Sequence, residues 1–163
     1  GLELYEEGHI PGARYLDLDG DLSSPVGHGP GRHPLPEAGS FADALGRGGI
    51  GRDTTAVIAY DDRGGAIAAR LWWLLGYFGF SGDRAILDGG LQAWTTAGHP
   101  VETGGAAPCA VAPMSLTADR DRVGDHQEVQ AALKLLLRRT FTSSGLPVWV
   151  TASFCSLFRR IDI

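Results

Sequence analysis

AVIAYDDRGGAIAARLWWLL, residues 56–75, predicts a strand, a short polar loop and a helix in direct succession. The run 56–60 has no polar break, which is typical of a strand covered on both faces of its sheet. Beyond the loop, apolar residues recur at helical spacing, at Ile67, Leu71, Leu74, Leu75 and Phe78. We therefore expect an α/β domain with a parallel sheet.

The loop between this strand and helix is the candidate active-site-like segment of the chain. It consists of Asp61, Asp62, Arg63, Gly64, Gly65 and Ala66. A loop at the carboxyl end of a parallel strand lies where α/β sheets bind their ligands. Its N–H groups also point inward at a helix N-terminus, which is a natural anion site. An ordinary turn from strand to helix is the alternative interpretation of the same residues.

Composition excludes several classes of function. The 163 residues carry a net charge of −5, so no basic footprint indicates a nucleic-acid partner. No signal peptide and no apolar run of membrane-spanning length is present. Only Cys109 and Cys155 occur, without a CxxC or HExxH pattern, so we expect no disulfide framework, no metal site and no cofactor. The expected compartment is the cytoplasm.

The first forty residues predict short elements and one long loop. Residues 1–8 resemble the end of a helix, and 14–18 alternate like a short strand. The loop 19–39 contains His28 and His33, which we interpret as solvated, with ligation or catalysis as the alternative. No strand precedes the first helix, so the sheet is expected to lack its first strand and to have an open position.

The middle of the chain predicts two more helices and a second strand. Ser40 and Asp43 have capping-box spacing at the start of a helix. Residues 84–88 predict a second buried strand, and residues 91–98 a helix. Asp88 precedes this last helix, and we interpret it as a helix cap rather than a catalytic acid.

The last third of the chain is less clearly patterned. Residues 105–124 are rich in Ala, Gly and Pro and predict a linker. Residues 125–139 predict a helix capped by Asp125, and 146–152 a possible strand that could fill the open position of the sheet. We leave 125–163 unassigned, with the start of a truncated second domain as one interpretation.

Three segments together resemble the rhodanese family of thiosulfate and 3-mercaptopyruvate sulfurtransferases. EEGHIPGA at 6–13 is similar to the signature near the start of that domain. RHPLP at 32–36, with Phe41 shortly after, is similar to a loop of those enzymes. ILDGGLQAW at 86–94 is similar to the family's last strand, turn and helix.

The resemblance implies a three-layer α/β domain over residues 1–104, with helices on both faces of a parallel sheet. Enzymes of this family have two tandem domains, and a cysteine directly after the central strand of the second domain accepts a sulfur atom as a persulfide. This chain resembles the first domain and has Asp61 at that position. The resemblance therefore implies a non-catalytic domain whose partner is the second rhodanese domain, in a fragment of a longer enzyme truncated at both ends.

Other interpretations remain open at this point. The Asp61 loop could serve a stand-alone inactive module that binds a basic peptide or a cation. Asp61 could be the nucleophile of a hydrolase, with Asp62 as its acid partner and Asp88 nearby. Cys109 lacks a basic neighbour in sequence and Cys155 lies in the unassigned tail, so neither is our choice of catalytic thiol.

Three arginines are candidates for contact with a partner or substrate. They are Arg14, Arg63 and Arg70, for which simple solvation is the alternative.

Overall fold

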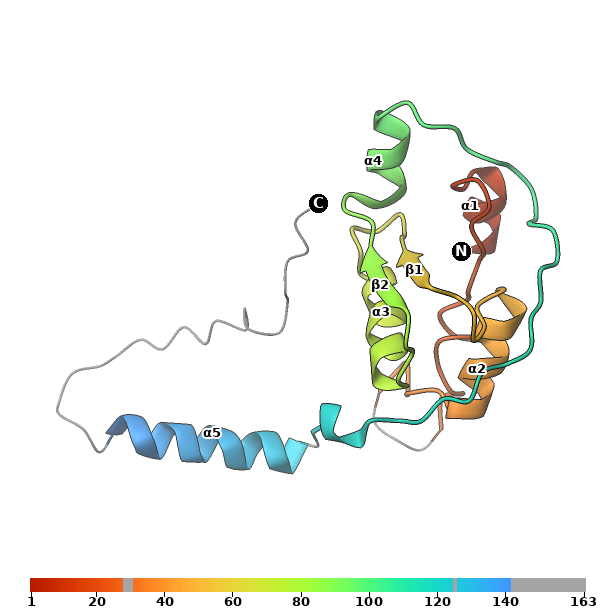
Figure 1. Cartoon of the computed structure of the whole chain (residues 1–163). Coiled ribbons are helices and arrows are strands. Elements are labelled where there is room, and N and C mark those ends of the chain that lie inside the picture. The colour runs from red at the N-terminus through yellow and green to blue at the C-terminus, as the bar shows by residue number, and fades with distance from the viewer. Residues whose placement is uncertain (28–30, 125, 142–163) are drawn as a thin grey trace. The chain divides into compact units, whose positions relative to one another are not determined.

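The computed structural model describes residues 1–27, 31–124 and 126–141 (Figure 1). The chain divides into two units, Gly1–Arg122 and Val123–Ile163. The first unit contains α1 (Leu2–Glu7), α2 (Ala38–Arg47), β1 (Ala56–Ala59), α3 (Ala68–Tyr77), β2 (Asp83–Ile86), α4 (Gly90–Thr96) and the short 3-10 helix η1 (Arg120–Arg122). In the second unit, the structure describes α5 (His126–Phe141).

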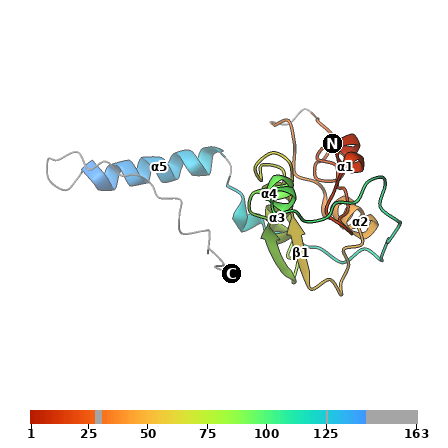
Figure 2. The same cartoon turned by 90° about the horizontal axis from the view of Figure 1, so that it is seen from above.

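β1 and β2 form a parallel pair, and α3 connects them. Val57 lies opposite Arg84 and Ile58 opposite Ala85 in the register of the two strands. In both views α1 and α2 lie on the side of β1 away from β2 (Figure 2). The expected α/β class is therefore confirmed, and among the described residues the sheet has two strands.

The core of the first unit lies between α2, α3 and one face of β1. Phe41 and Leu45 of α2 and Leu74 of α3 are completely buried. The Phe41 ring lies 5.1 Å from the ring of Phe78, centroid to centroid. Burial of each such side chain stabilises the fold by roughly 1.5–3 kcal/mol. These contacts fix α3, and with it the loop that precedes the helix.

Neither strand is buried as expected: β1 is not covered on both faces, and β2 is only partly buried. Along β1, Val57 and Ala59 are buried, whereas the Ile58 side chain is 64% exposed. β2 begins at Asp83 and alternates between exposed and half-buried residues. α3 packs against both strands and leaves the Ile58 side chain exposed, and among the described residues the sheet has no third strand.

The strand expected at 14–18 is also absent. These residues have no regular secondary structure, and Tyr15 donates its hydroxyl hydrogen to Asp17 at 2.9 Å. Residues 13–18 and β1 line the same cavity, and no described strand pairs with 14–18. An alternating pattern predicts a strand only if a partner edge is within reach.

Two helix caps differ from the sequence-based expectation. α2 begins at Ala38 after Glu37, two residues before Ser40, so the capping box of Ser40 and Asp43 does not form. α4 begins after Gly89, whose φ of 70° places it in the left-handed region, and no side chain caps the helix. The cap role predicted for Asp88 is therefore not observed.

Much of the expected linker 105–124 belongs to the first unit and packs on its core. The N–H of Val111 donates to the Gly46 carbonyl at 2.9 Å, and that of Thr117 to the Phe78 carbonyl at 3.2 Å. Met114, Leu116 and Ala118 pack against the core. The linker prediction failed here because apolar residues spaced among prolines can still cover a core.

Several predictions fall on residues that the structure does not describe. His28, Asp125, Cys155 and the strand at 146–152 lie outside the described ranges. The predicted helix at 125–139 corresponds to α5. Among the described residues, no helix combines the length and the apolar run needed to cross a bilayer.

Candidate functional site

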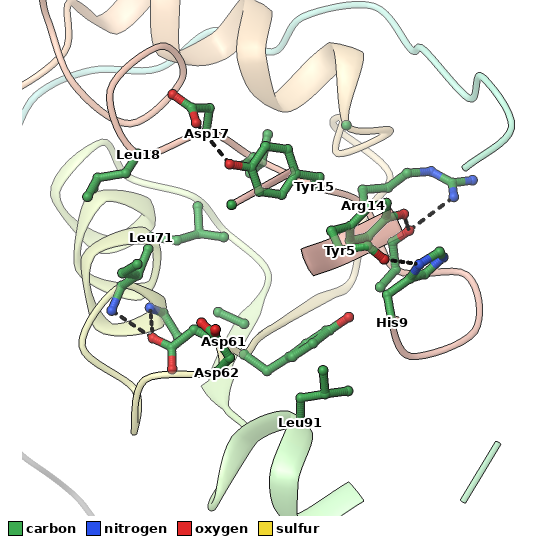
Figure 3. Close-up of a pocket in the computed structure, with 18 of the residues that line it drawn as sticks. Tyr5, His9, Arg14, Tyr15, Asp17, Leu18, Asp61, Asp62, Leu71 and Leu91 are labelled. Carbon is green, nitrogen blue, oxygen red and sulfur yellow. Dashed lines mark hydrogen bonds between the residues drawn. The ribbon is translucent and has the colours of Figure 1, made fainter. Parts of the chain in front are cut away.

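Asp61 occupies the centre of the loop between β1 and α3. Its Oδ1 accepts hydrogen bonds from the N–H groups of Arg63 at 2.9 Å and Gly65 at 2.7 Å. Its Oδ2 accepts from the N–H groups of Ile67 at 2.7 Å and Ala68 at 2.9 Å. The carboxylate lies at the start of α3, on one wall of the cavity in Figure 3. We call these four donors the Asp61 cradle.

The sequence of the loop explains why the cradle closes so tightly. Gly64 and Gly65 have φ values of 70° and 88°, a region that side chains other than glycine rarely adopt. This turn directs the loop N–H groups inward, and α3 adds donors that its own hydrogen-bond ladder leaves free. Partial burial alone would raise the pKa of Asp61, but the four N–H donors outweigh it and hold the pKa below its usual value.

The cradle is also joined to α4. The Asp61 carbonyl accepts a hydrogen bond from the Leu91 N–H at 3.2 Å. Gly90 lies directly against this carbonyl, with a φ of 55°, and a Cβ at that position would collide with the oxygen. The DGG turn before α4 therefore allows the close approach that fixes the loop.

The remaining residues of the predicted loop are largely exposed. Asp62, Arg63, Gly64 and Ala66 are exposed. Asp62 pairs with Arg63 at 3.9 Å, and Asp88 is exposed on its own turn. Among the described residues, no group of three His, Cys, Asp or Glu side chains is arranged to hold a metal ion. The arrangement gives no support to a hydrolase that uses Asp61 and Asp62 as an acid pair.

Arg70 of α3 fixes the long loop rather than facing a partner. Its Nε donates to the Leu22 carbonyl at 2.9 Å. One terminal nitrogen donates to the Ser23 hydroxyl and to the carbonyls of His33 and Pro34, at 2.9–3.1 Å. Sequence reasoning missed this role, because the acceptors are backbone carbonyls more than thirty residues away in the chain.

An Asp–His pair lies on the same loop. His33 Nε2 lies 3.2 Å from Asp19 Oδ1, and the His33 side chain is 29% exposed. A carboxylate at this distance orients an imidazole ring. His33 is therefore paired and partly covered, rather than a freely solvated loop residue. The fourteen-residue separation gave no sequence signal for the pair.

Cys109 has a basic neighbour, contrary to the expectation from its sequence surroundings. The Arg14 Nε lies 2.8 Å from the Cys109 Sγ, although the two residues are 95 positions apart. Arg14 also donates to the carbonyl of Ala13 at 3.2 Å. Arg14 is thus engaged within the chain, and Cys109 lies away from the Asp61 cradle, beside a separate cavity.

A cavity of the first unit opens beside the Asp61 cradle. It has a volume of about 550 Å³ and extends between residues 13–18 and residues 56–60. Tyr15 and Asp17 lie on one side and Asp61 and Asp62 on the other (Figure 3). Among the described residues that line it there is no cysteine.

The fold and this loop define an α/β domain with an anion cradle at the carboxyl end of a parallel strand. The profile of the rhodanese-like domain matches residues 2–97. The chain therefore belongs to the rhodanese family.

Individual relatives agree with this assignment. A Pseudomonas aeruginosa protein named "Probable 3-mercaptopyruvate sulfurtransferase" is 48% identical over 105 residues, which cover 64% of this chain and 37% of the relative. The human 3-mercaptopyruvate sulfurtransferase is 40% identical over 121 residues, 72% of this chain and 37% of the relative. The chain thus spans little more than a third of the length of these proteins.

A solved structure gives the same result in three dimensions. SseA from Escherichia coli, described as a 3-mercaptopyruvate sulfotransferase with the rhodanese fold, superposes with a TM-score of 0.65 at 30% sequence identity. The match covers 80% of this chain and 48% of that chain.

Proposed function

We propose that this chain carries the non-catalytic first rhodanese domain of a two-domain sulfurtransferase, where it packs on and supports the domain that carries the catalytic cysteine. The observation that carries the proposal is the Asp61 carboxylate, held by four N–H donors at the position where the family resemblance places the thiolate. Thiosulfate and 3-mercaptopyruvate are the sulfur donors we propose for the whole enzyme, from the names of the relatives.

The chemistry of sulfur transfer explains why the side chain at this position matters. A thiolate attacks the outer sulfur of thiosulfate, the sulfur–sulfur bond of the donor breaks, sulfite leaves, and a cysteine persulfide forms. Asp61 offers oxygen instead of sulfur and cannot form that persulfide. Its carboxylate also accepts the N–H groups that would otherwise bind an incoming anion.

A stand-alone module that binds a cation through this loop has weaker support. Each Asp61 oxygen already accepts two N–H groups. A cation would have to displace these donors, whose hydrogens point at the carboxylate and repel positive charge. Asp62 is partly neutralised by Arg63. The loop geometry therefore favours a closed, structural cradle.

A coupled turnover assay tests the proposal. The purified 163-residue chain is incubated with thiosulfate and cyanide, and with 3-mercaptopyruvate, and thiocyanate or pyruvate is measured. We expect no turnover above the buffer control. Adding the separately expressed part of the Pseudomonas relative that this chain does not match should then give turnover severalfold above that part alone.

Two results would contradict the proposal. Turnover by the chain alone would show a catalytic group that the Asp61 loop does not explain. If adding the chain leaves the turnover rate of the partner fragment unchanged, the chain has no supporting role.

A further inference from the structure

An isolated antiparallel bridge ties the segment after α4 to the end of α1. The N–H of His9 donates to the Glu102 carbonyl at 2.9 Å, and the N–H of Glu102 donates to the His9 carbonyl at 2.8 Å. Next to the bridge, the Gly104 N–H donates to the Glu6 carbonyl at 2.7 Å. The Gly12 N–H donates to Oε2 of Glu102 at 3.0 Å. We call these four hydrogen bonds the 9–102 clasp.

The His9 side chain is buried inside the clasp, with 2% of the residue exposed. Its ring stacks on the ring of Tyr5, with centroids 3.9 Å apart and planes at 12°. The Nδ1 of His9 lies 2.8 Å from the Tyr5 carbonyl oxygen (Figure 3). Because a carbonyl only accepts hydrogen bonds, Nδ1 carries a hydrogen, and Nε2 carries none when the imidazole is neutral.

The second ring nitrogen faces a change of partner when the imidazole binds a proton. Nε2 of His9 lies 3.8 Å from Oε2 of Glu102. A neutral imidazole has only a lone pair at this nitrogen, which gains nothing from a nearby carboxylate, whereas an imidazolium has an N–H and a positive charge there. The face of the Tyr5 ring also attracts positive charge. Burial opposes a charged ring, so the Glu102 carboxylate is the group that offsets this cost.

The other titratable groups around His9 keep their charge between about pH 5 and pH 8. Tyr5, Tyr60 and Arg14 line the same cavity as His9. Burial raises the pKa of Tyr5 and that of Tyr60 above the ordinary tyrosine value, so both stay neutral. Arg14 stays protonated throughout. Histidine is the side chain whose charge ordinarily changes in this range. The charged groups of α1 beside the clasp are two exposed acids, Glu6 and Glu7.

We propose that the 9–102 clasp tightens when His9 takes up a proton from solvent at Nε2, because the imidazolium then forms an ion pair with Glu102. The clasp holds the segment that leads from α4 into residues 105–119, which pack on the first unit. Acidification from about pH 7.5 to about pH 5.5 therefore fixes this segment more firmly to α1. The proposal is independent of the sulfurtransferase role.

Amide hydrogen exchange of the ¹⁵N-labelled 163-residue chain, followed by NMR at both pH values, tests the proposal. Protection factors correct for the intrinsic pH dependence of exchange, and α3 serves as the internal reference. We expect protection of the Glu102 and Gly104 N–H groups, relative to α3, to be about threefold higher at the lower pH.

Three variants assign the effect to its residues. Glu102→Gln keeps an oxygen that can accept from Gly12 but removes the negative charge, so the increase in protection should disappear. His99→Gln, at an exposed position after α4, should retain the increase. His33→Gln removes the histidine that pairs with Asp19, and it should also retain the increase at the clasp.

Three results would overturn the proposal. Protection of the wild-type clasp that is equal at the two pH values, or lower at the acidic one, would show that the proton does not tighten it. An increase that persists in Glu102→Gln would show that the ion pair is not its cause. An increase that disappears in His33→Gln would assign the effect to the pair of His33 and Asp19 instead.

Discussion

The N–H of Ala68, the first residue of α3, donates to the Oδ2 of Asp61 at 2.9 Å across seven positions of sequence. This bond joins the end of the β1 segment to the start of the helix that follows it. With the three other N–H donors of the cradle, it makes the Asp61 carboxylate a built-in anion. The loop is therefore shaped around a group of the protein itself.

Replacement of Asp61 by asparagine should destabilise the domain. An asparagine presents an NH₂ group to N–H donors on one side of the cradle, so two of the four bonds are lost and donors face each other. We expect the free energy of unfolding in urea to fall by about 1–3 kcal/mol. Asp62→Asn, at the exposed neighbouring position, should change it by less than about 0.5 kcal/mol. Equal effects of the two substitutions would contradict the cradle.

Acid should weaken the same interaction. The folded-state pKa of Asp61 is lowered, so its ionised form stabilises the fold above the unfolded value of about 3.9. That stabilisation is lost as the pH falls through the lower folded-state pKa. Urea unfolding between about pH 6 and pH 2.5 should therefore show a larger loss in the wild-type chain than in Asp61→Asn. Parallel curves would indicate that another group carries the acid dependence.

Gly90→Ala should destabilise the domain, both through backbone strain and through a steric clash. Alanine at Gly90 is strained at a φ of 55° and its Cβ collides with the Asp61 carbonyl. Alanine at Gly12 meets the same kind of strain at a φ of 78°, but no atom lies within 4 Å of its Cβ. Gly90→Ala should cost about 1–3 kcal/mol more unfolding free energy than Gly12→Ala. Similar costs would mean that the contact between Gly90 and Asp61 is unimportant.

Arg70→Lys should loosen the long loop while the helices remain folded. A lysine keeps the charge but cannot reproduce the fork that reaches the carbonyls of Leu22, His33 and Pro34. Hydrogen exchange in residues 22–27 and 31–34 should accelerate by about tenfold, with exchange in α3 changed little. Arg52→Lys, at an exposed position, is the matched control. An unchanged loop in Arg70→Lys would rule out this anchoring role.

The sequence predicted the helices more accurately than the strands. The apolar spacing from Ile67 to Phe78 is local, and α3 forms where it predicts. The burial of Ile58 depends on whether another segment lies beside β1, and that information is not local. The same reason explains why the alternating residues 14–18 form no strand.

The loop around Asp61 could be predicted in outline but not in detail. Its place after a strand and before a helix indicated an anion site, but not that Asp61 itself fills the site. The contacts of Arg14 with Cys109 and of Arg70 with the long loop join residues far apart in the chain. Such pairs depend on the folded path of the backbone and carry no periodic signal.

We propose that oxygen, not sulfur, occupies the position at which the family resemblance places the thiolate. Intact-mass measurement after incubation with excess thiosulfate, followed by peptide mapping, tests it most directly. We expect that neither the wild-type chain nor Cys109→Ser gains the mass of a sulfur atom. A stable gain of one sulfur in the wild-type chain, mapped to any of its residues, would contradict it.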